Sequence, residues 1–361
     1  MNTPMNTPNR PTRFARTIAT TVISLGLATG LAHGDDPTSN PTVWVANGRD
    51  ATVSVIDRVD GETLARLPSG GNPHVLQLSP DGSTMYVVNA GGHDLPDDDG
   101  AAHAGRPDAS PLATNSLWAL DTSSGDVVGR VAVGAGPTHP VPSQDGTRVY
   151  VTNTDEDSVS IVDTRSWTVI ETVTGVPEPH DAAITADGTR LLIAAAGSNE
   201  VLVVDTETRA IVDRFAVGNK VRGLILDHDD AVAYATNKAD GTVSRIDLAS
   251  GDVQTFAVGA GPHGLRLAPD GSRLYVALSG ANAVAYVDPA SGDVERTVPV
   301  GASPEQLDIS PDGAWLAVAN AADETVTLVN VERAAPIRTS STGPGTFGVA
   351  FSNAPLDARA P

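Results

Sequence analysis

The stretch RVYVTN at residues 148–153 is followed by SVSIVD at 158–163, WTVIETV at 167–173 and PHDAAIT at 179–185. Each run alternates apolar and polar residues or is rich in β-branched ones, and turn-forming residues separate it from the next. This pattern predicts four consecutive short β-strands. A lone four-stranded sheet leaves both of its faces exposed, so such a unit needs copies of itself to pack against.

Two sets of aspartates indicate that the copies are present. The first set ends each predicted third strand, with an asparagine in the seventh place: Asp57, Asp121, Asp163, Asp205, Asp247, Asp288 and Asn330. The second set lies in the turn after each first strand: Asp81, Asp145, Asp187, Asp229, Asp270 and Asp312. Both sets are spaced by 41 or 42 residues, apart from one shared interval of 64. A period of about 40–45 residues with four strands per unit is typical of β-propeller blades.

The sequence therefore predicts an all-β, seven-bladed β-propeller with four antiparallel strands per blade over residues 42–352. The first blade begins with its second strand, at 42–47, and lacks a first strand of its own. The run FGVAFS at 347–352 supplies that strand, so the C-terminal strand joins the N-terminal blade and closes the ring. The other blades are predicted near 74–133, 139–174, 180–217, 222–258, 263–300 and 305–338, and residues 353–361 are predicted to be a tail.

The N-terminus has the pattern of a signal peptide. Arg10, Arg13 and Arg16 precede an apolar run at 17–32 that is too short and too interrupted to span a membrane. We expect a signal peptide over residues 1–34, cleaved near residues 32–34, and a periplasmic or secreted protein. Since no second apolar run follows, we expect no membrane span in the mature chain.

Composition narrows the partners. The chain has 44 acidic and 23 basic residues and a formal charge of −21. Such a charge repels phosphate backbones, so nucleic acid is not an expected partner. Cysteine is absent, which excludes disulfides, thiolate metal sites and covalent haem attachment. We expect a monomer.

The strand Tyr150-Val151-Thr152-Asn153, with the downstream Val162-Asp163 and the Gly-Pro-His segments, resembles the YVTN family of seven-bladed β-propeller repeats. That family includes lactonase-like, surface-layer and periplasmic propeller proteins. The resemblance covers nearly the whole mature chain and implies the propeller fold. It implies less about function, because propellers host many unrelated activities.

The order of the strands predicts on which face the candidate site residues lie. The loops between second and third strands and the links between blades share one face, called the top face below, and the remaining turns share the bottom face. Six residues lie at or beside the starts of the innermost strands: His74, His139, His180, Arg222, His263 and Glu305. We predict that they form a ligand-binding site at the top of the central channel. The alternative is that Gly-Pro-His is a feature of the fold, in which each imidazole braces a link between blades.

The interval of 64 residues places an inserted loop at residues 90–114, on the top face. It contains His93, Asp94 and His103, which together with His139 and His180 are candidate ligands of a divalent metal ion. Copper or zinc is expected before calcium. The alternative is a solvated Asp-rich loop, because the spacing matches no defined metal motif.

Two functions are compatible with this sequence. The first is an exported, non-catalytic binding or scaffold protein that presents its top face to a metal ion, a small ligand or a protein partner. The alternative is a lactonase-like hydrolase that uses histidine and acidic residues at the channel mouth as general acid and base: His180, Asp181, His263 and Glu305. No local catalytic motif occurs, so no residue is assigned a catalytic role.

Overall fold

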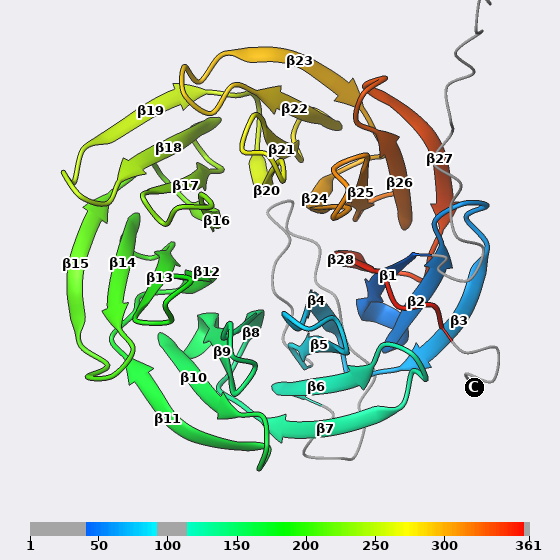
Figure 1. Cartoon of the computed structure of the whole chain (residues 1–361), viewed down its shortest axis with the longest axis horizontal. Coiled ribbons are helices and arrows are strands. Elements are labelled where there is room, and N and C mark those ends of the chain that lie inside the picture. The colour runs from blue at the N-terminus through cyan, green and yellow to red at the C-terminus, as the bar shows by residue number, and fades with distance from the viewer. Residues whose placement is uncertain (1–40, 92–113, 357–361) are drawn as a thin grey trace, which may run out of the picture. The chain divides into compact units, whose positions relative to one another are not determined.

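The computed structural model of the protein describes residues 41–91 and 114–356. These residues form 28 β-strands in seven four-stranded antiparallel sheets, arranged as blades around a central channel (Figure 1). The described residues also contain two short 3-10 helices, η1 (Gly48–Asp50) and η2 (Thr154–Glu156). The prediction of a seven-bladed β-propeller with four antiparallel strands per blade is confirmed.

Each blade runs from an innermost strand at the channel to an outermost strand at the rim. In that order, blades 1 to 3 are β28 (Thr346–Ser352), β1 (Thr42–Asn47), β2 (Thr52–Asp57), β3 (Thr63–Pro68); β4 (Pro73–Leu78), β5 (Thr84–Asn89), β6 (Ser116–Asp121), β7 (Val127–Ala132); and β8 (Pro137–Pro142), β9 (Arg148–Asn153), β10 (Ser158–Asp163), β11 (Thr168–Thr174). Blades 4 and 5 are β12 (Pro179–Ile184), β13 (Arg190–Ala195), β14 (Glu200–Asp205), β15 (Ile211–Ala216); and β16 (Val221–Leu226), β17 (Val232–Asn237), β18 (Thr242–Asp247), β19 (Val253–Ala257). Blades 6 and 7 are β20 (Pro262–Leu267), β21 (Leu274–Leu278), β22 (Ala283–Val287), β23 (Val294–Pro299); and β24 (Pro304–Ile309), β25 (Trp315–Asn320), β26 (Thr325–Asn330), β27 (Ala335–Ser341).

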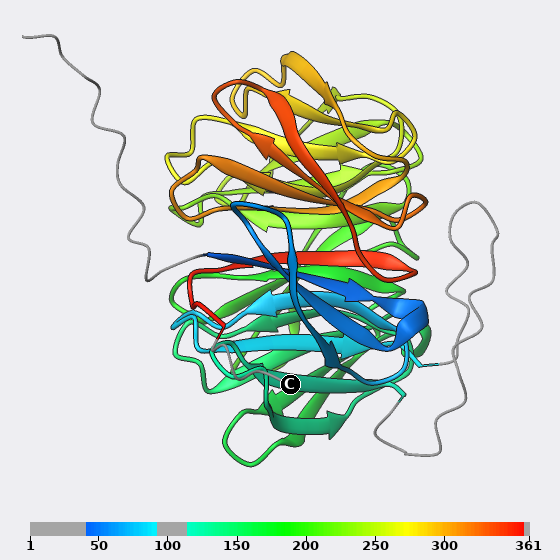
Figure 2. The ribbon, with the colours of Figure 1, turned by 90° about the vertical axis from the view of Figure 1, so that its right-hand side faces the viewer.

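The ring closes through a strand from the far end of the chain. β28 pairs antiparallel with β1, with Val349 opposite Val45 and Phe351 opposite Val43. Figure 2 shows β28, in red, alongside the blue strands of blade 1. The predicted joining of the C-terminal strand to the N-terminal blade is therefore confirmed.

The asparagine that ends several second strands ties three segments together. In blade 5, Asn237 Nδ2 donates hydrogen bonds to the hydroxyls of Thr242 and Ser244, both at 2.9 Å. Its Oδ1 accepts a hydrogen bond from the backbone N–H of Gly218, in the link from blade 4, at 3.0 Å. Asn47, Asn153 and Asn320 donate to two hydroxyls of their third strands in the same way.

The aspartate at the end of the third strand closes the next turn. Asp205 Oδ1 accepts hydrogen bonds from the backbone N–H groups of Glu207 and Thr208, at 3.2 and 2.7 Å. The same two bonds recur in five other blades, at Asp57, Asp121, Asp163, Asp247 and Asp288. An aspartate suits this position because its short carboxylate can reach the backbone two and three residues onward.

The core lies between neighbouring blades and is mostly aliphatic. In the interface of blades 3 and 4, Val159 and Ile161 pack in one cluster with Leu191, Ile193 and Leu202. Comparable clusters fill the other interfaces, so each blade buries its faces against its two neighbours.

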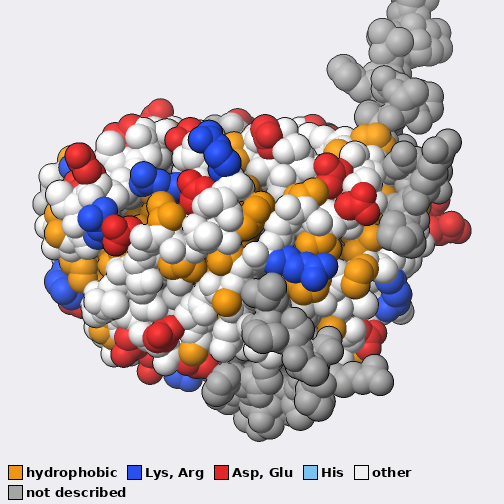
Figure 3. All heavy atoms as spheres, turned by 90° about the horizontal axis from the view of Figure 1, so that it is seen from below, with side chains coloured by type: hydrophobic (Ala, Val, Ile, Leu, Met, Phe, Trp, Pro, Cys, Tyr) orange, Lys and Arg blue, Asp and Glu red, His pale blue; other side chains and the backbone are white. Residues whose placement is uncertain are grey.

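The outer surface carries mixed charge. On the face shown in Figure 3, acidic and basic side chains alternate in small groups, with separate hydrophobic side chains between them. Within the described part of the chain, seven large hydrophobic side chains are exposed, and six of them lie on outermost strands, such as Leu64, Val128 and Val212; the seventh, Val59, lies in the turn between β2 and β3. Among the described residues, no helix is long and apolar enough to cross a membrane.

Several predicted segments fall wholly or partly outside the described residues. These are the signal peptide (1–34), the inserted loop (90–114) except for its first two residues and its last, and the end of the tail (353–361). Asn89 ends β5 and Ser116 begins β6, so both ends of the insertion lie at the top face.

Candidate functional site

The second residues of the innermost strands form one layer at the top of the channel. They are His74, Thr138, His180, Arg222, His263, Glu305 and Phe347. All but Phe347 line a cavity of about 470 Å³, called the upper cavity below. These six residues occupy the same position of the repeat in six different blades. The symmetry of the ring therefore brings their side chains together.

Three of these side chains are buried imidazoles. The ring centroids of His180 and His263 lie 5.3 Å apart, and that of His139, one residue further along its strand, lies 5.1 Å from His180. His74 packs against Phe347 with a centroid distance of 5.1 Å. The Nδ1 atoms of all four histidines are buried and have no hydrogen-bond partner within the described residues.

Burial keeps these imidazoles neutral. Desolvation is the main cause that lowers the pKa of His180 and His263 well below the usual 6.5, and the charge of nearby Arg222 adds to it. Burial likewise lowers the pKa of His74 to about 4. Desolvation also lowers the pKa of His139, although Asp181 opposes the shift. A neutral imidazole at neutral pH can accept a proton or a hydrogen bond from a ligand.

Threonines of neighbouring blades hold the histidine backbone. Thr138 and Thr152 both donate hydrogen bonds to the carbonyl oxygen of His180, at 2.8 and 2.9 Å. Thr236 donates to the carbonyl oxygen of His263 at 2.6 Å. Thr152 and Thr236 precede the strand-ending asparagines, so the Thr-Asn pair of one blade positions the histidine of the next.

Charged residues surround the upper cavity unevenly. Lys220, Arg222 and Lys238, all from blade 5 or the link before it, bring positive charge to one side. Asp155, Asp157 and Glu178, from the loops of blade 3 and the link to blade 4, bring negative charge to another. Sequence reasoning did not single out these two lysines and three acids, although they lie in the segments that it assigned to the top face.

His139 and Asp181 occupy a different level from the other predicted site residues. Both line a second cavity of about 490 Å³, the lower cavity, which opens among the bottom-face turns and shares no lining residue with the upper one. His139 Nε2 lies 3.0 Å from Gln306 Nε2 across the channel and 3.9 Å from Asp181 Oδ1. The predicted set is thus divided: His74, His180, Arg222, His263 and Glu305 line the upper cavity, and His139 does not.

The predicted metal site is only partly represented. His93, Asp94 and His103 lie outside the described residues, whereas the rings of His139 and His180 are neighbours. Within residues 41–91 and 114–356, no group of three or more His, Cys, Asp or Glu side chains is arranged to hold a metal ion. A site completed by the inserted loop stays a prediction.

Fold and site together define a seven-bladed β-propeller with a cavity at one end of its channel. Buried, neutral imidazoles and both positively and negatively charged side chains line this cavity. The chain belongs to the family described as lactonase, seven-bladed β-propeller, whose model matches residues 52–336. No curated protein matches the sequence.

Solved structures repeat the fold at low sequence identity. A candidate 6-phosphogluconolactonase from Bacteroides fragilis has a TM-score of 0.70 and 20% identity, covering 88% of this chain and 99% of that one. A periplasmic gluconolactonase from Pseudomonas aeruginosa has a TM-score of 0.70 and 22% identity, covering 87% and 99%. Hydrazine synthase from Kuenenia stuttgartiensis has a TM-score of 0.68 and 18% identity, covering 84% and 98%. At this identity the likeness extends to the fold alone.

Proposed function

We propose that the protein is a lactone hydrolase that acts in the upper cavity. The observation that carries this proposal is the pair of buried, neutral imidazoles of His180 and His263, 5.3 Å apart and beside Arg222, in a member of the lactonase propeller family. The hydrolase alternative drawn from the sequence is thereby preferred over a non-catalytic binding or scaffold protein, for which family membership offers no support.

The chemistry needs one base, one oxyanion stabiliser and one acid. A neutral imidazole accepts a proton from water while the water oxygen attacks the lactone carbonyl carbon. The guanidinium of Arg222 stabilises the negative charge that develops on the carbonyl oxygen. The ring C–O bond then breaks, and the imidazolium returns its proton to the departing ring oxygen. The product is a hydroxycarboxylic acid, which releases a proton to solvent.

The substrate class follows from the cavity and from the relatives. A cavity of about 470 Å³ lies within the range of small-molecule sites. Two of the structural relatives are named for gluconolactone or its 6-phosphate. We therefore assign aldonolactones as the substrates. One relative is periplasmic, and together with the predicted signal peptide it supports a periplasmic location. A protein partner on the top face and a monomeric state remain predictions.

The test is hydrolysis of glucono-1,5-lactone and its 6-phosphate, followed by acid release above the spontaneous rate. We expect His180→Gln and His263→Gln each to lower kcat/KM by about 10²–10⁴-fold if that imidazole is the base. At least one of them must do so, because both lie in the cavity that the proposal uses.

The matched control is His228→Gln, which changes an exposed histidine in a bottom-face turn. This variant should hydrolyse lactones at the wild-type rate. Wild-type protein without activity on any lactone, but with saturable binding of one, would favour the binding-protein alternative. Activity that survives both histidine substitutions would remove the proposed site.

A further inference from the structure

The lower cavity is a built chamber that the proposed hydrolysis does not use. Its lining residues come from the innermost strands of blades 2 to 6 and from the bottom-face turns. Its volume of about 490 Å³ is within the range of small-molecule sites. The contact between Gln306 and His139 crosses the channel between the levels of the two cavities. The chamber therefore opens to solvent at the face opposite the upper cavity.

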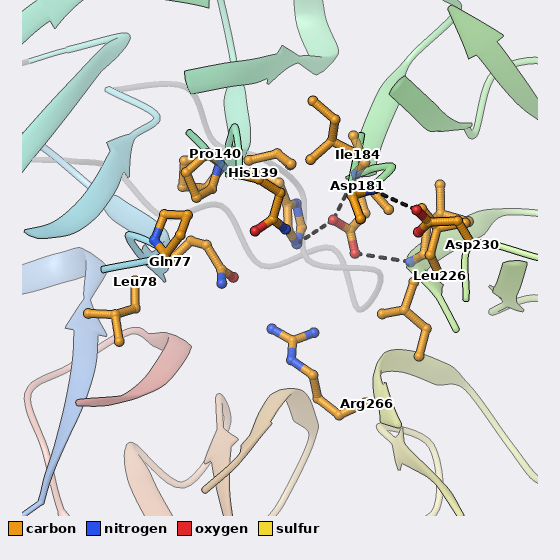
Figure 4. A pocket seen from close by; sticks show the side chains of 18 of the residues that line it. Gln77, Leu78, His139, Pro140, Asp181, Ile184, Leu226, Asp230 and Arg266 are labelled. Carbon is orange, nitrogen blue, oxygen red and sulfur yellow. Dashed lines mark hydrogen bonds and ion pairs between the residues drawn. The ribbon is translucent and has the colours of Figure 1, made fainter. Parts of the chain in front are cut away.

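Polar side chains reach this chamber from several blades. Figure 4 shows Gln77, His139, Asp181 and Arg266 converging on the cavity from different strands. Arg266 Nε donates to Asp308 Oδ1 at 3.1 Å and Nη1 donates to the carbonyl oxygen of Leu265 at 3.0 Å, which leaves further N–H donors of the guanidinium available. His139 is buried, and its Nδ1 lacks a partner within the described residues.

At the level of the fifth strand position, one side of the chamber is apolar. Val141, Ala183 and Ile225 occupy the fifth position of the innermost strands of three consecutive blades, and all three line the cavity. The same position in blades 2 and 6 is held by Gln77 and Arg266. At this level the aliphatic side chains of blades 3 to 5 therefore face the amide of blade 2 and the guanidinium of blade 6.

The charges of the chamber disfavour an anion. Three carboxylates line it, those of Asp181, Asp227 and Asp230, against the guanidinium of Arg266. That guanidinium is already paired with Asp308, which neutralises most of its attraction for a second anion. Asp181 is held in place because its two oxygens accept the backbone N–H groups of Ala182 and Leu224, at 2.8 and 3.0 Å.

We propose that the lower cavity is a second binding site, selective for an uncharged cyclic polyol such as a hexose sugar. Arg266 and Gln77 donate hydrogen bonds to ring or hydroxyl oxygens, and the carboxylates accept hydrogen bonds from hydroxyls. The C–H face of the sugar rests on the aliphatic side formed by Val141, Ala183 and Ile225. This site is independent of the proposed hydrolysis, because no residue of the upper cavity takes part in it.

The experiment is a calorimetric titration of the full chain with D-glucose, compared with gluconate as the anionic counterpart. We expect saturable binding of glucose and at least about tenfold weaker binding of gluconate, the difference that about 1.4 kcal/mol produces. Gln77→Leu, which keeps side-chain volume but removes the amide, should weaken glucose binding about tenfold. Ala183→Phe, which fills the chamber, should abolish it.

Controls separate this site from the upper cavity. His263→Gln should leave glucose binding unchanged, while Gln77→Leu and Ala183→Phe should retain lactone hydrolysis if the wild-type protein shows it. If Ala183→Phe fails to fold, Gln77→Leu alone decides, with its fold checked by circular dichroism. Absence of saturable glucose binding in the wild type, or binding that Gln77→Leu leaves unchanged, would overturn the proposal, and tighter binding of gluconate would overturn its charge selectivity.

Discussion

At the scale of single residues, the repeat motif has a physical meaning that the sequence pattern alone did not reveal. In blade 5, Asn237 joins its own blade to the preceding link, and Thr236 before it holds His263 of the following blade. A motif that looked like a signature of fold therefore also supports the candidate site. The alternative reading of Gly-Pro-His, in which the histidine only braces the links, does not account for four Nδ1 atoms without partners among the described residues.

Asn237 provides a direct test of the role of the strand-ending asparagine. Asn237→Ala removes three hydrogen bonds of a fully buried amide and leaves the N–H of Gly218 without its acceptor. We expect the free energy of unfolding to fall by roughly 2–3 kcal/mol, measured by urea denaturation. Gln254→Ala, at an exposed position of the same blade, should change it by less than about 0.5 kcal/mol. Equal effects of the two substitutions would contradict the role assigned to Asn237.

The pH dependence of hydrolysis tests the proposed base. Since burial lowers the pKa of His180 and His263 well below 6.5, both imidazoles stay unprotonated as the pH falls through 6.5. We expect kcat/KM to be level from about pH 7.5 down to about pH 6 and to decline only at lower pH, because kcat/KM reports ionisation of the free enzyme. A profile with its midpoint at an ordinary histidine pKa would mean that a different, exposed histidine is the base.

The period of the repeat made part of the candidate site predictable from the sequence. His74, His180, Arg222, His263 and Glu305 share one position of the repeat, so the period alone placed them together. His139 is one residue out of that register, so alternation along the strand turns its side chain away from the others, and it lines the lower cavity instead. Gln77, Arg266 and Gln306 carried no sequence signal, because an amide or a single arginine within a strand is common.

At the scale of elements, β28 is the strand on which blade 1 depends. Phe347, Val349 and Phe351 are each at most 5% exposed, and β28 covers the inner edge of β1. Removal of residues 346–361 should expose that edge. It should also expose apolar surface whose burial stabilises the fold by several kcal/mol, so we expect aggregation or unfolding at 25 °C. Soluble yield and size-exclusion chromatography measure this result.

The control for this deletion is a shorter one. Removing only residues 357–361 leaves β28 whole, and this variant should remain folded with a thermal midpoint close to that of the full chain. A soluble, cooperatively unfolding protein without residues 346–361 would show that blade 1 is stable with three strands and that closure by β28 is dispensable.

Element boundaries were predicted closely because turns mark them. The Pro-Asp-Gly and Ser-Gly-Asp turns place glycine at positive φ, as at Gly82 and Gly251, and the aspartates complete the hydrogen bonds of the turns. The depth at which each innermost side chain sits could not be read in the same way. It depends on how seven twisted sheets approach one axis, which no local pattern encodes.

At the scale of the whole molecule, the free energy of unfolding should decrease in two stages as the pH is lowered. The pKa of His74 is lowered to about 4 from 6.5, so the unfolded chain binds this proton first, and stability is full above pH 6.5 and falls between 6.5 and about 4. This single group accounts for up to roughly 3 kcal/mol. Below 3.8, protonation of the turn aspartates, whose pKa values are lowered by hydrogen bonds, removes further stability.

Urea denaturation between about pH 7.5 and 4 measures the first stage. His74→Gln should reduce the dependence of the free energy of unfolding on pH in this range, because the variant has one buried imidazole fewer to protonate. If the wild-type and variant curves run parallel between pH 6.5 and 4, His74 is not held neutral by burial.

The interlock between β1 and β28 also has a consequence for biogenesis. During synthesis the amino-terminal blade emerges first, yet its inner strand is among the last parts of the chain to appear. The ring therefore cannot be completed one blade at a time from the amino terminus. The edge of β1 that pairs with β28 stays unpaired while the six other blades assemble. A chaperone that shields extended edges, or rapid delivery of the carboxyl terminus, would shorten that vulnerable interval.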